Sequence, residues 1–95
     1  MFKTININDL LTIINKINII DIRSVQKYNS GHIPNAINIP YDNLILNPSK
    51  YINKDNTYYI YCNMGQKSVS ICTYLSKLGY KTVNISGGYE KWLLK

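Results

Sequence analysis

The amino-acid sequence predicts a three-layer α/β fold, with a mostly parallel central sheet of about five strands and helices on both faces. Two observations support this class. Apolar runs too short for helices alternate along the chain with segments of helical character. One run, INIIDI at 17–22, is β-branched without polar alternation, as expected of a strand buried on both faces. The length of 95 residues suits one domain, which we place at 1–95.

Five segments are predicted as strands. The fourth, TYYIY, is the best candidate for the centre of the sheet, and the third is stopped by Pro40. Because strands separated by helices pair in parallel, their carboxyl ends should meet at one edge of the sheet. The predicted strands cover residues 3–7, 17–22, 36–40, 57–61 and 81–85.

Helical segments are predicted between these strands. Asn8 or Asp9 is the candidate cap of the first, and Ser24 is the candidate cap of the second. The third is a helical turn followed by the loop 47–56. The fourth has one apolar face and ends at Gly79. The predicted helices cover residues 10–16, 25–29, 41–46, 66–78 and 87–95.

The charge of the chain is positive but diffuse. The formal net charge is +6, yet only one of the eleven Lys and Arg residues is an arginine, Arg23, and the lysines form no cluster. Nucleic-acid sites usually use several arginines on one surface, so we expect no nucleic-acid partner. A diffuse positive field slightly favours small anionic substrates.

Location and membrane association are also constrained. No apolar run approaches the ~20 residues that span a bilayer, so no membrane partner is expected. The N-terminal segment has no apolar core followed by a small-residue cleavage site, which argues against a signal peptide. We therefore expect a cytoplasmic protein, in which the two cysteines are free thiols.

The two cysteines occupy different places in the predicted fold. Cys62 stands at the carboxyl end of the predicted central strand, where active sites collect in parallel sheets. Cys72 lies inside the following helix, beside the apolar positions Ile71 and Leu75, and is explained by packing. A disulfide between them is not expected, because several residues of helix separate Cys72 from the loop. There is no C-x-x-C pair for dithiol chemistry.

The loop 62–68, CNMGQKS, favours a negative charge on Cys62. If the strand ends near Cys62 and a helix follows, the backbone N–H groups can curl around the sulfur, with the helix N-terminus behind them. Gly65 allows a tight turn, and Lys67 adds a positive charge. Such surroundings lower the pKa of a thiol and make a nucleophile that needs no histidine. A buried, unreactive cysteine in an ordinary β–α turn is the alternative.

Three segments of the chain resemble the rhodanese (sulfurtransferase) domain family. The loop at Cys62 has the family's order of cysteine, four residues, a basic residue and a hydroxyl residue. The segment 21–44 is similar to its D-x-R…G-H-I-x-x-A-x-N-I-P pattern, and 78–92 is similar to its closing strand and G-G-x-x-x-W helix. The resemblance runs from about residue 4 to 93 in family order, and implies a small rhodanese-like fold in a single-domain member. It is carried by Asp21, Arg23, Gly31, His32, Ile33, Ala36, Asn38, Ile39, Pro40, Gly87, Gly88 and Trp92.

The resemblance implies that Cys62 is the catalytic nucleophile and carries sulfur as a persulfide, without any cofactor. In a double displacement, it would take sulfur from thiosulfate or a persulfide donor and pass it to cyanide, a thiol or a partner protein. Lys67 stands where arginine is usual and lacks its planar fork, and Met64 stands where small polar residues are common. Both departures concern which sulfur donor is used, more than the sulfur chemistry itself. The implied substrate-binding loop consists of Asn63, Met64, Gly65, Gln66, Lys67 and Ser68.

Other polar residues have simpler interpretations. Asp21 and Arg23 flank a strand end near the same sheet edge as Cys62. We interpret them as a local ion pair or helix cap, with support of the Cys62 loop as the functional alternative. His32 is interpreted as structural. No His, Cys and Asp cluster has metal-ligand spacing, and no glycine-rich phosphate loop is present, so no metal is predicted.

Two other functions are consistent with parts of the sequence. Cysteine phosphatases and arsenate reductases also use a cysteine in an amide ring, but phosphatase loops place arginine after five residues, where this chain has Ser68. The basic Lys67 comes one position too early, which disfavours this class. A binding module without turnover is the second alternative. In its softer form, the protein is a persulfide relay with slow thiosulfate chemistry and a dedicated protein donor.

Overall fold

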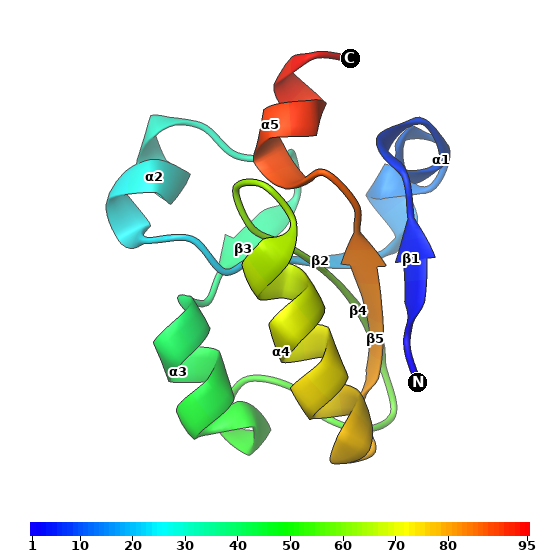
Figure 1. The fold of residues 1–95 in the computed structure, drawn as a ribbon, viewed down its shortest axis with the longest axis vertical. Helices are drawn as coiled ribbons and strands as arrows, with labels where there is room; N and C mark the ends of the chain where they lie inside the picture. The colour runs from blue at the N-terminus through cyan, green and yellow to red at the C-terminus, as the bar shows by residue number, and fades with distance from the viewer.

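The computed structural model describes all of residues 1–95. Its five strands form one sheet in the order β1-β5-β4-β2-β3 (Figure 1). Every neighbouring pair is parallel, and β4 lies at the centre, as predicted. The strands are β1 (Lys3–Ile5), β2 (Asn18–Asp21), β3 (Ala36–Asn38), β4 (Thr57–Tyr61) and β5 (Lys81–Ile85).

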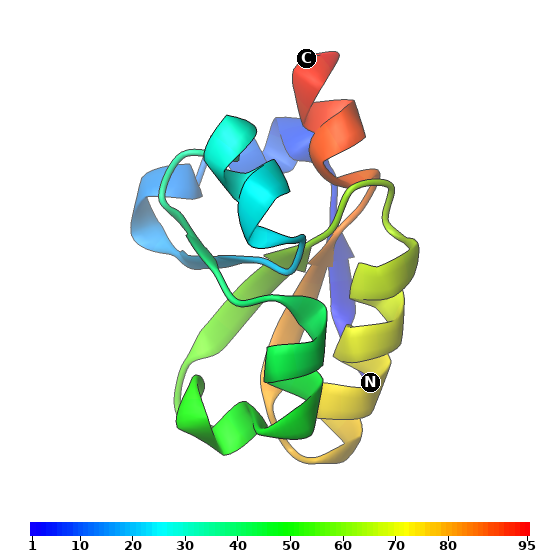
Figure 2. The same cartoon turned by 90° about the vertical axis from the view of Figure 1, so that its left-hand side faces the viewer.

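Helices cover both faces of the sheet. Figure 2 shows α4, in yellow, on one side of the sheet and the segment after α1, in light blue, on the other. In Figure 1, α2, α5 and the start of α4 gather beyond the arrowheads of the strands, at their carboxyl ends. The helices are α1 (Ile7–Leu11), α2 (Val25–Ser30), α3 (Tyr41–Leu46), α4 (Gln66–Lys77) and α5 (Gly88–Leu93), with 3₁₀ turns η1 (Ile14–Lys16) and η2 (Pro48–Lys50).

One core lies between the sheet and the helices α3 and α4. Alternate residues of β4, Tyr58 and Ile60, contribute to it, and Ile71 and Leu75 of α4 pack against them. Cys72 is fully buried in this core, which confirms that packing accounts for its place on the apolar helical face. Because side chains alternate along a strand, the residue after β4 on this same face is residue 62.

A second core lies on the opposite face. Ile19, Tyr61 and Ile85 project from three strands and pack against Leu10 of α1 and Trp92 of α5. Burial on both faces accounts for the continuous apolar character of the strands in the sequence, which one-sided sheets do not show. The closing helix thus packs against this face of the sheet through Trp92.

The first helix differs from its prediction. It begins at Ile7, because the side chain of Asn6 accepts a hydrogen bond of 2.8 Å from the N–H of Asp9 and caps it. The predicted cap at Asn8 or Asp9 and the predicted span 10–16 are therefore wrong. The β-branched run at 12–14 has low helix propensity, so the helix ends at Leu11 and the single turn η1 follows.

Other predicted boundaries hold to within a few residues. Ser24 caps α2 as predicted, accepting a hydrogen bond of 3.3 Å from the N–H of Lys27. The predicted loop 47–56 contains the turn η2, which Pro48 begins. None of the helices has the length and apolar character that a membrane crossing requires.

Candidate active site

Cys62 directly follows β4 and opens the loop to α4. Its side chain continues the face of Tyr58 and Ile60, so it points toward the first turn of α4. The residue is 6% exposed, so its sulfur is shielded from bulk water. Cys62 therefore lies at the predicted edge of the sheet, where it lines a cleft, whereas Cys72 is fully buried and does not.

Backbone amides surround the sulfur. The N–H of Gly65 donates to Cys62 Sγ at 3.1 Å, and the N–H of Ser68 donates at 3.4 Å. The loop reaches this geometry because Gly65 has φ +106°, in the left-handed region that favours glycine. Gly65 is also the N-cap of the 12-residue helix α4, so the positive end of a helix dipole faces the sulfur.

The pKa values of the two cysteines shift in opposite directions. Burial alone would raise the pKa of Cys62, but hydrogen bonding with the Ser68 hydroxyl and hydrogen bonds from the N–H groups of Ser68, Gly65 and Met64 outweigh it, so the pKa is lowered. For Cys72, burial raises the pKa to about 11. Of the two cysteines, only Cys62 therefore has surroundings that stabilise its thiolate.

A polar pair lies beneath the loop. Ser68 is fully buried, with its Oγ 3.6 Å from Cys62 Sγ and 2.6 Å from Asn84 Oδ1. Asn84 comes from β5, beside the central strand. Sequence reasoning included Ser68 in the loop but missed Asn84. A polar residue in a strand buried on both faces is the signal that could have identified it.

The closing helix holds the outer side of the loop. The N–H of Tyr89 donates to the carbonyl of Cys62 at 2.9 Å, and the N–H of Glu90 donates to the carbonyl of Asn63 at 3.0 Å. These bonds turn the loop carbonyls toward α5. A Cβ at Gly88 would collide with the Cys62 carbonyl and lie 2.7 Å from that of Asn63, which explains why glycine occupies this position.

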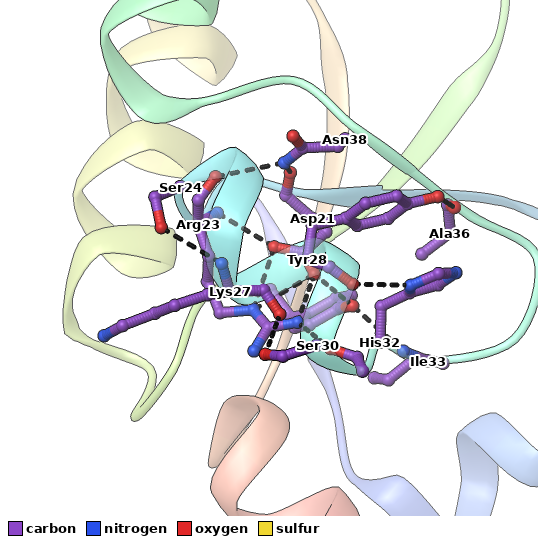
Figure 3. A network of polar contacts seen from close by, with 12 residues as sticks. Asp21, Arg23, Ser24, Lys27, Tyr28, Ser30, His32, Ile33, Ala36 and Asn38 are labelled. Carbon is purple, nitrogen blue, oxygen red and sulfur yellow. Dashed lines mark hydrogen bonds and ion pairs between the residues drawn. The ribbon is translucent and has the colours of Figure 1, made fainter.

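Asp21 and Arg23 form a buried ion pair behind the site (Figure 3). Arg23 donates from Nε to the two carboxylate oxygens at 3.0 and 3.1 Å, and from Nη2 to Asp21 Oδ2 at 2.7 Å and the carbonyl of Gly31 at 2.6 Å. Tyr61 donates its hydroxyl proton to Asp21 at 2.6 Å and accepts from the N–H of Ile33 at 3.0 Å. No buried side-chain polar atom lacks a partner.

This ion pair also joins the three sequence segments. The guanidinium of Arg23 lies 4.2 Å from the centre of the Tyr89 ring, and a Cβ at Gly31 would lie 2.5 Å from the Tyr89 hydroxyl. Asn38 donates to the backbone carbonyls of Asp21 and Arg23 at 3.0 Å each. The local ion pair is therefore present as predicted, and Arg23 also contacts the helix whose N–H groups bond to the Cys62 loop.

His32 lies outside this arrangement. Its ring stacks on that of Tyr28 with centroids 3.8 Å apart, and its Nδ1 is 2.9 Å from the Tyr28 carbonyl (Figure 3). The residue does not line the cleft at Cys62. These contacts agree with the structural interpretation of His32.

An open cleft of about 310 Å³ leads to Cys62. Arg23, Lys27 and Lys67 are among its lining residues, and of these Arg23 is paired with Asp21. Lys27 was missed in the sequence, because only the fold brings α2 to this edge; in Figure 3 its side chain extends away from Asp21. No group of three His, Cys, Asp or Glu side chains is arranged to hold a metal ion. The other lining residues are Ile22, Ser24, Asn63, Met64 and Gln66.

Comparison with known proteins agrees with this geometry. A family model described as Rhodanese-like domain matches residues 6–95. A Bacillus subtilis protein provisionally named a sulfurtransferase is 36% identical over 76 residues, covering 78% of this chain and 71% of that protein. A thiosulfate sulfurtransferase of Escherichia coli is 34% identical over 72 residues, covering 75% and 69%.

A solved structure shows the same fold. The crystal structure of a rhodanese-related protein from Thermoplasma volcanium matches with a TM-score of 0.89 at 31% identity, covering 98% of this chain and 92% of that one. The family match spans the loop at Cys62, the ion pair of Asp21 and Arg23 and the closing helix. The chain therefore belongs to the rhodanese-like domain family of sulfurtransferases.

Proposed function

We propose that this protein is a sulfurtransferase that carries sulfane sulfur as a persulfide on Cys62. The observation that carries the proposal is the hydrogen bonding of Cys62 Sγ to the N–H groups of Gly65 and Ser68, at 3.1 and 3.4 Å, at the base of a basic cleft. That arrangement stabilises a thiolate before transfer, and it can stabilise the negative terminal sulfur afterwards.

The reaction is a double displacement. The Cys62 thiolate attacks the outer sulfur of thiosulfate, forming a new S–S bond while the S–S bond of thiosulfate breaks and sulfite leaves with the electron pair. A nucleophilic acceptor such as cyanide, a thiol or a partner protein's cysteine then attacks the terminal sulfur. The Cys62 thiolate leaves and is regenerated, so no external oxidant or reductant is needed. Backbone amides of 63–68 bind the negative sulfur at each stage.

The donor is a small anion or a persulfide. Lys27 and Lys67 place two flexible ammonium groups at the cleft, which attract an anion without the fixed bidentate geometry of arginine. A persulfide, whether free or on a partner protein, needs less of this recognition than thiosulfate does. We therefore propose two forms of this function. In one, the protein uses thiosulfate directly; in the other, it is a relay that receives sulfur from a persulfide donor. The two free cysteines fit a cytoplasmic setting.

Intact-mass measurement tests the proposal. Wild type, Cys62→Ser and Cys72→Ser are incubated with thiosulfate and then with cyanide. We expect wild type and Cys72→Ser to gain one sulfur atom that cyanide removes, and Cys62→Ser to gain none. If wild type gains none from thiosulfate, the same test with a persulfide donor separates the relay from a binding module. A chain that gains no sulfur from either donor would overturn the proposed function.

A further inference from the structure

A buried amide, that of Asn84, lies beneath the Cys62 loop. Asn84 is 3% exposed and belongs to β5, on the face that packs against α4. Its only side-chain hydrogen bond is with Ser68 Oγ, at 2.6 Å. Burying an amide costs free energy that an apolar residue would not, so its place beside the site requires a reason.

The Ser68 hydroxyl has one proton and three neighbouring acceptors. These are Asn84 Oδ1 at 2.6 Å, the carbonyl of Gly65 at 3.1 Å and Cys62 Sγ at 3.6 Å. When Cys62 is a thiol, its S–H can donate to Ser68 Oγ, whose own proton goes to Asn84 Oδ1. The Cys62 thiol, the Ser68 hydroxyl and the Asn84 amide oxygen then each have a hydrogen-bond partner, which is the arrangement in the structure.

When Cys62 is a thiolate, the direction of these hydrogen bonds must reverse. The sulfur then requires the Ser68 proton, and two acceptors would face each other at 2.6 Å if the Asn84 oxygen stayed in place. If the Asn84 side-chain amide rotates by half a turn, Nδ2 takes the place of Oδ1 and donates a hydrogen bond to Ser68 Oγ. Asparagine can do this because it carries a donor and an acceptor of equal size on one side chain.

We propose that Asn84 is a positioning residue for Cys62, whose amide turns to orient the Ser68 hydroxyl toward or away from the sulfur. In one orientation the hydroxyl accepts from the thiol, and in the other it donates to the thiolate. This deepens the proposed function, since the thiolate is the form that attacks the donor. An ionised aspartate at this position offers only acceptors and cannot satisfy the second state.

Other charged and titratable groups around Cys62 do not replace this role. None of them forms a hydrogen bond with the Ser68 hydroxyl, whose partners are Cys62, Gly65 and Asn84, and all of them remain in the variants below. They are Arg23 with its partner Asp21 after β2, Lys27 from α2, and Lys67 and Cys72 from α4.

Nuclear magnetic resonance of the wild-type protein under reducing conditions tests the proposal directly. The side-chain NH₂ resonances of Asn84 should change with pH at the same midpoint as the Cβ of Cys62. In Ser68→Ala and in Cys62→Ser they should not follow that midpoint. The NH₂ group of Asn38, which donates to two fixed carbonyls, is the internal control and should not respond. Asn84 resonances that ignore the titration, or that follow it without Ser68, would overturn the proposal.

The midpoint of Cys62 ionisation in an Asn84 variant provides a second test. Asn84→Asp should raise the midpoint of Cys62 ionisation by about one pH unit or more, which slows alkylation at neutral pH by about tenfold. In the Ser68→Ala background the shift should be smaller, because only charge repulsion remains. Thr82→Val, at a buried position on the same face, changes a hydroxyl bonded to the Cys72 carbonyl and should leave the midpoint unchanged. Equal Asn84→Asp shifts in both backgrounds would contradict the role of Ser68.

These measurements are independent of sulfur transfer. They follow protonation of Cys62 and the orientation of one amide, in the absence of any donor. Failure of the proposed function would appear as a lack of persulfide mass with the Asn84 titration intact. Failure of the present inference would appear as a loaded persulfide with Asn84 resonances that do not titrate.

Discussion

The backbone N–H of Tyr89 donates a hydrogen bond of 2.9 Å to the carbonyl of Cys62. This bond joins the first turn of the closing helix to the cysteine that we propose carries the sulfur. With the bond from the N–H of Glu90 to Asn63, it fixes the direction of two loop peptides, so that the loop carbonyls face α5 while amides farther along face the sulfur. The amide ring thus depends on α5 as well as on α4.

Gly88→Ala should disrupt the site through these bonds. The added Cβ would collide with the Cys62 carbonyl, and the residue has φ +60°, so the loop or the helix must shift. We expect a decrease of about tenfold or more in the rate of persulfide formation and a loss of about 1–3 kcal/mol in the free energy of unfolding. Persulfide mass against time and urea denaturation measure the two effects.

Gly79→Ala is the matched control. Gly79 has φ +97°, so alanine introduces similar backbone strain, but its Cβ would be in ordinary contact with the Lys54 side chain at 3.6 Å, away from Cys62. It should reduce stability while leaving the rate of persulfide formation in the folded protein near that of wild type. Equal rates for the two variants would show that α5 does not orient the loop.

Tyr61→Phe tests the hydrogen bonds behind the site. The change removes a bond to the Asp21 carboxylate and leaves the buried N–H of Ile33 without its acceptor. We expect a loss of about 1–3 kcal/mol in the free energy of unfolding, measured by urea denaturation. Tyr59→Phe, on the same face of β4 but half-buried, should change stability by less than about 0.5 kcal/mol. Similar losses in both variants would mean that the hydroxyl bonds of Tyr61 are not the cause.

The sequence was sufficient to place Cys62 at the carboxyl end of the central strand because two local rules agree on this position. Parallel strands gather chemistry at their carboxyl ends, and the change from strand to helix periodicity around the loop shows where β4 ends. The same periodicity explains Cys72 as a core residue. For Asp21 and Arg23 the sequence allows two interpretations; the structure shows the ion pair and a contact of Arg23 with Tyr89, and support of the site stays a prediction.

What the sequence could not provide depends on contacts between distant segments. Asn84 is an ordinary residue of a short strand until β5 is placed beside β4 and its side chain meets Ser68. Lys27 joins the cleft only because α2 folds over the sheet edge. The start of α1 was mispredicted because Asn6, Asn8 and Asp9 are all good capping residues, and local sequence does not show where β1 ends.

Lys67 should govern the choice of donor. Its ammonium group lines the cleft and lies 5.6 Å from the centre of the Tyr41 ring. We expect Lys67→Arg to raise kcat/KM for thiosulfate several-fold, about threefold to tenfold, since a planar fork grips an oxyanion better. Lys67→Ala should lower it by about tenfold, with a smaller effect on a persulfide donor.

Steady-state kinetics with both donors, at low and high salt, measure this effect. Lys77→Ala removes a lysine from the other end of α4 and should leave both donors unaffected at fixed salt. If Lys67→Ala lowers kcat/KM equally for thiosulfate and for the persulfide donor, the lysine does not discriminate between them.

Cys72 should make the protein sensitive to alkali. Burial raises its pKa to about 11, whereas an unfolded cysteine ionises near pH 8.5, so above that pH the unfolded chain releases a proton that the folded protein retains. Its contribution to stability is complete below about pH 8.5 and is lost as the pH rises toward 11, on the order of 3 kcal/mol in total. Cys72→Val should remove this part of the decline, seen in urea denaturation at several pH values with a reductant present. Cys62→Ser should not, because the lowered pKa of Cys62 acts below that window, and a decline unchanged by Cys72→Val would refute the assignment.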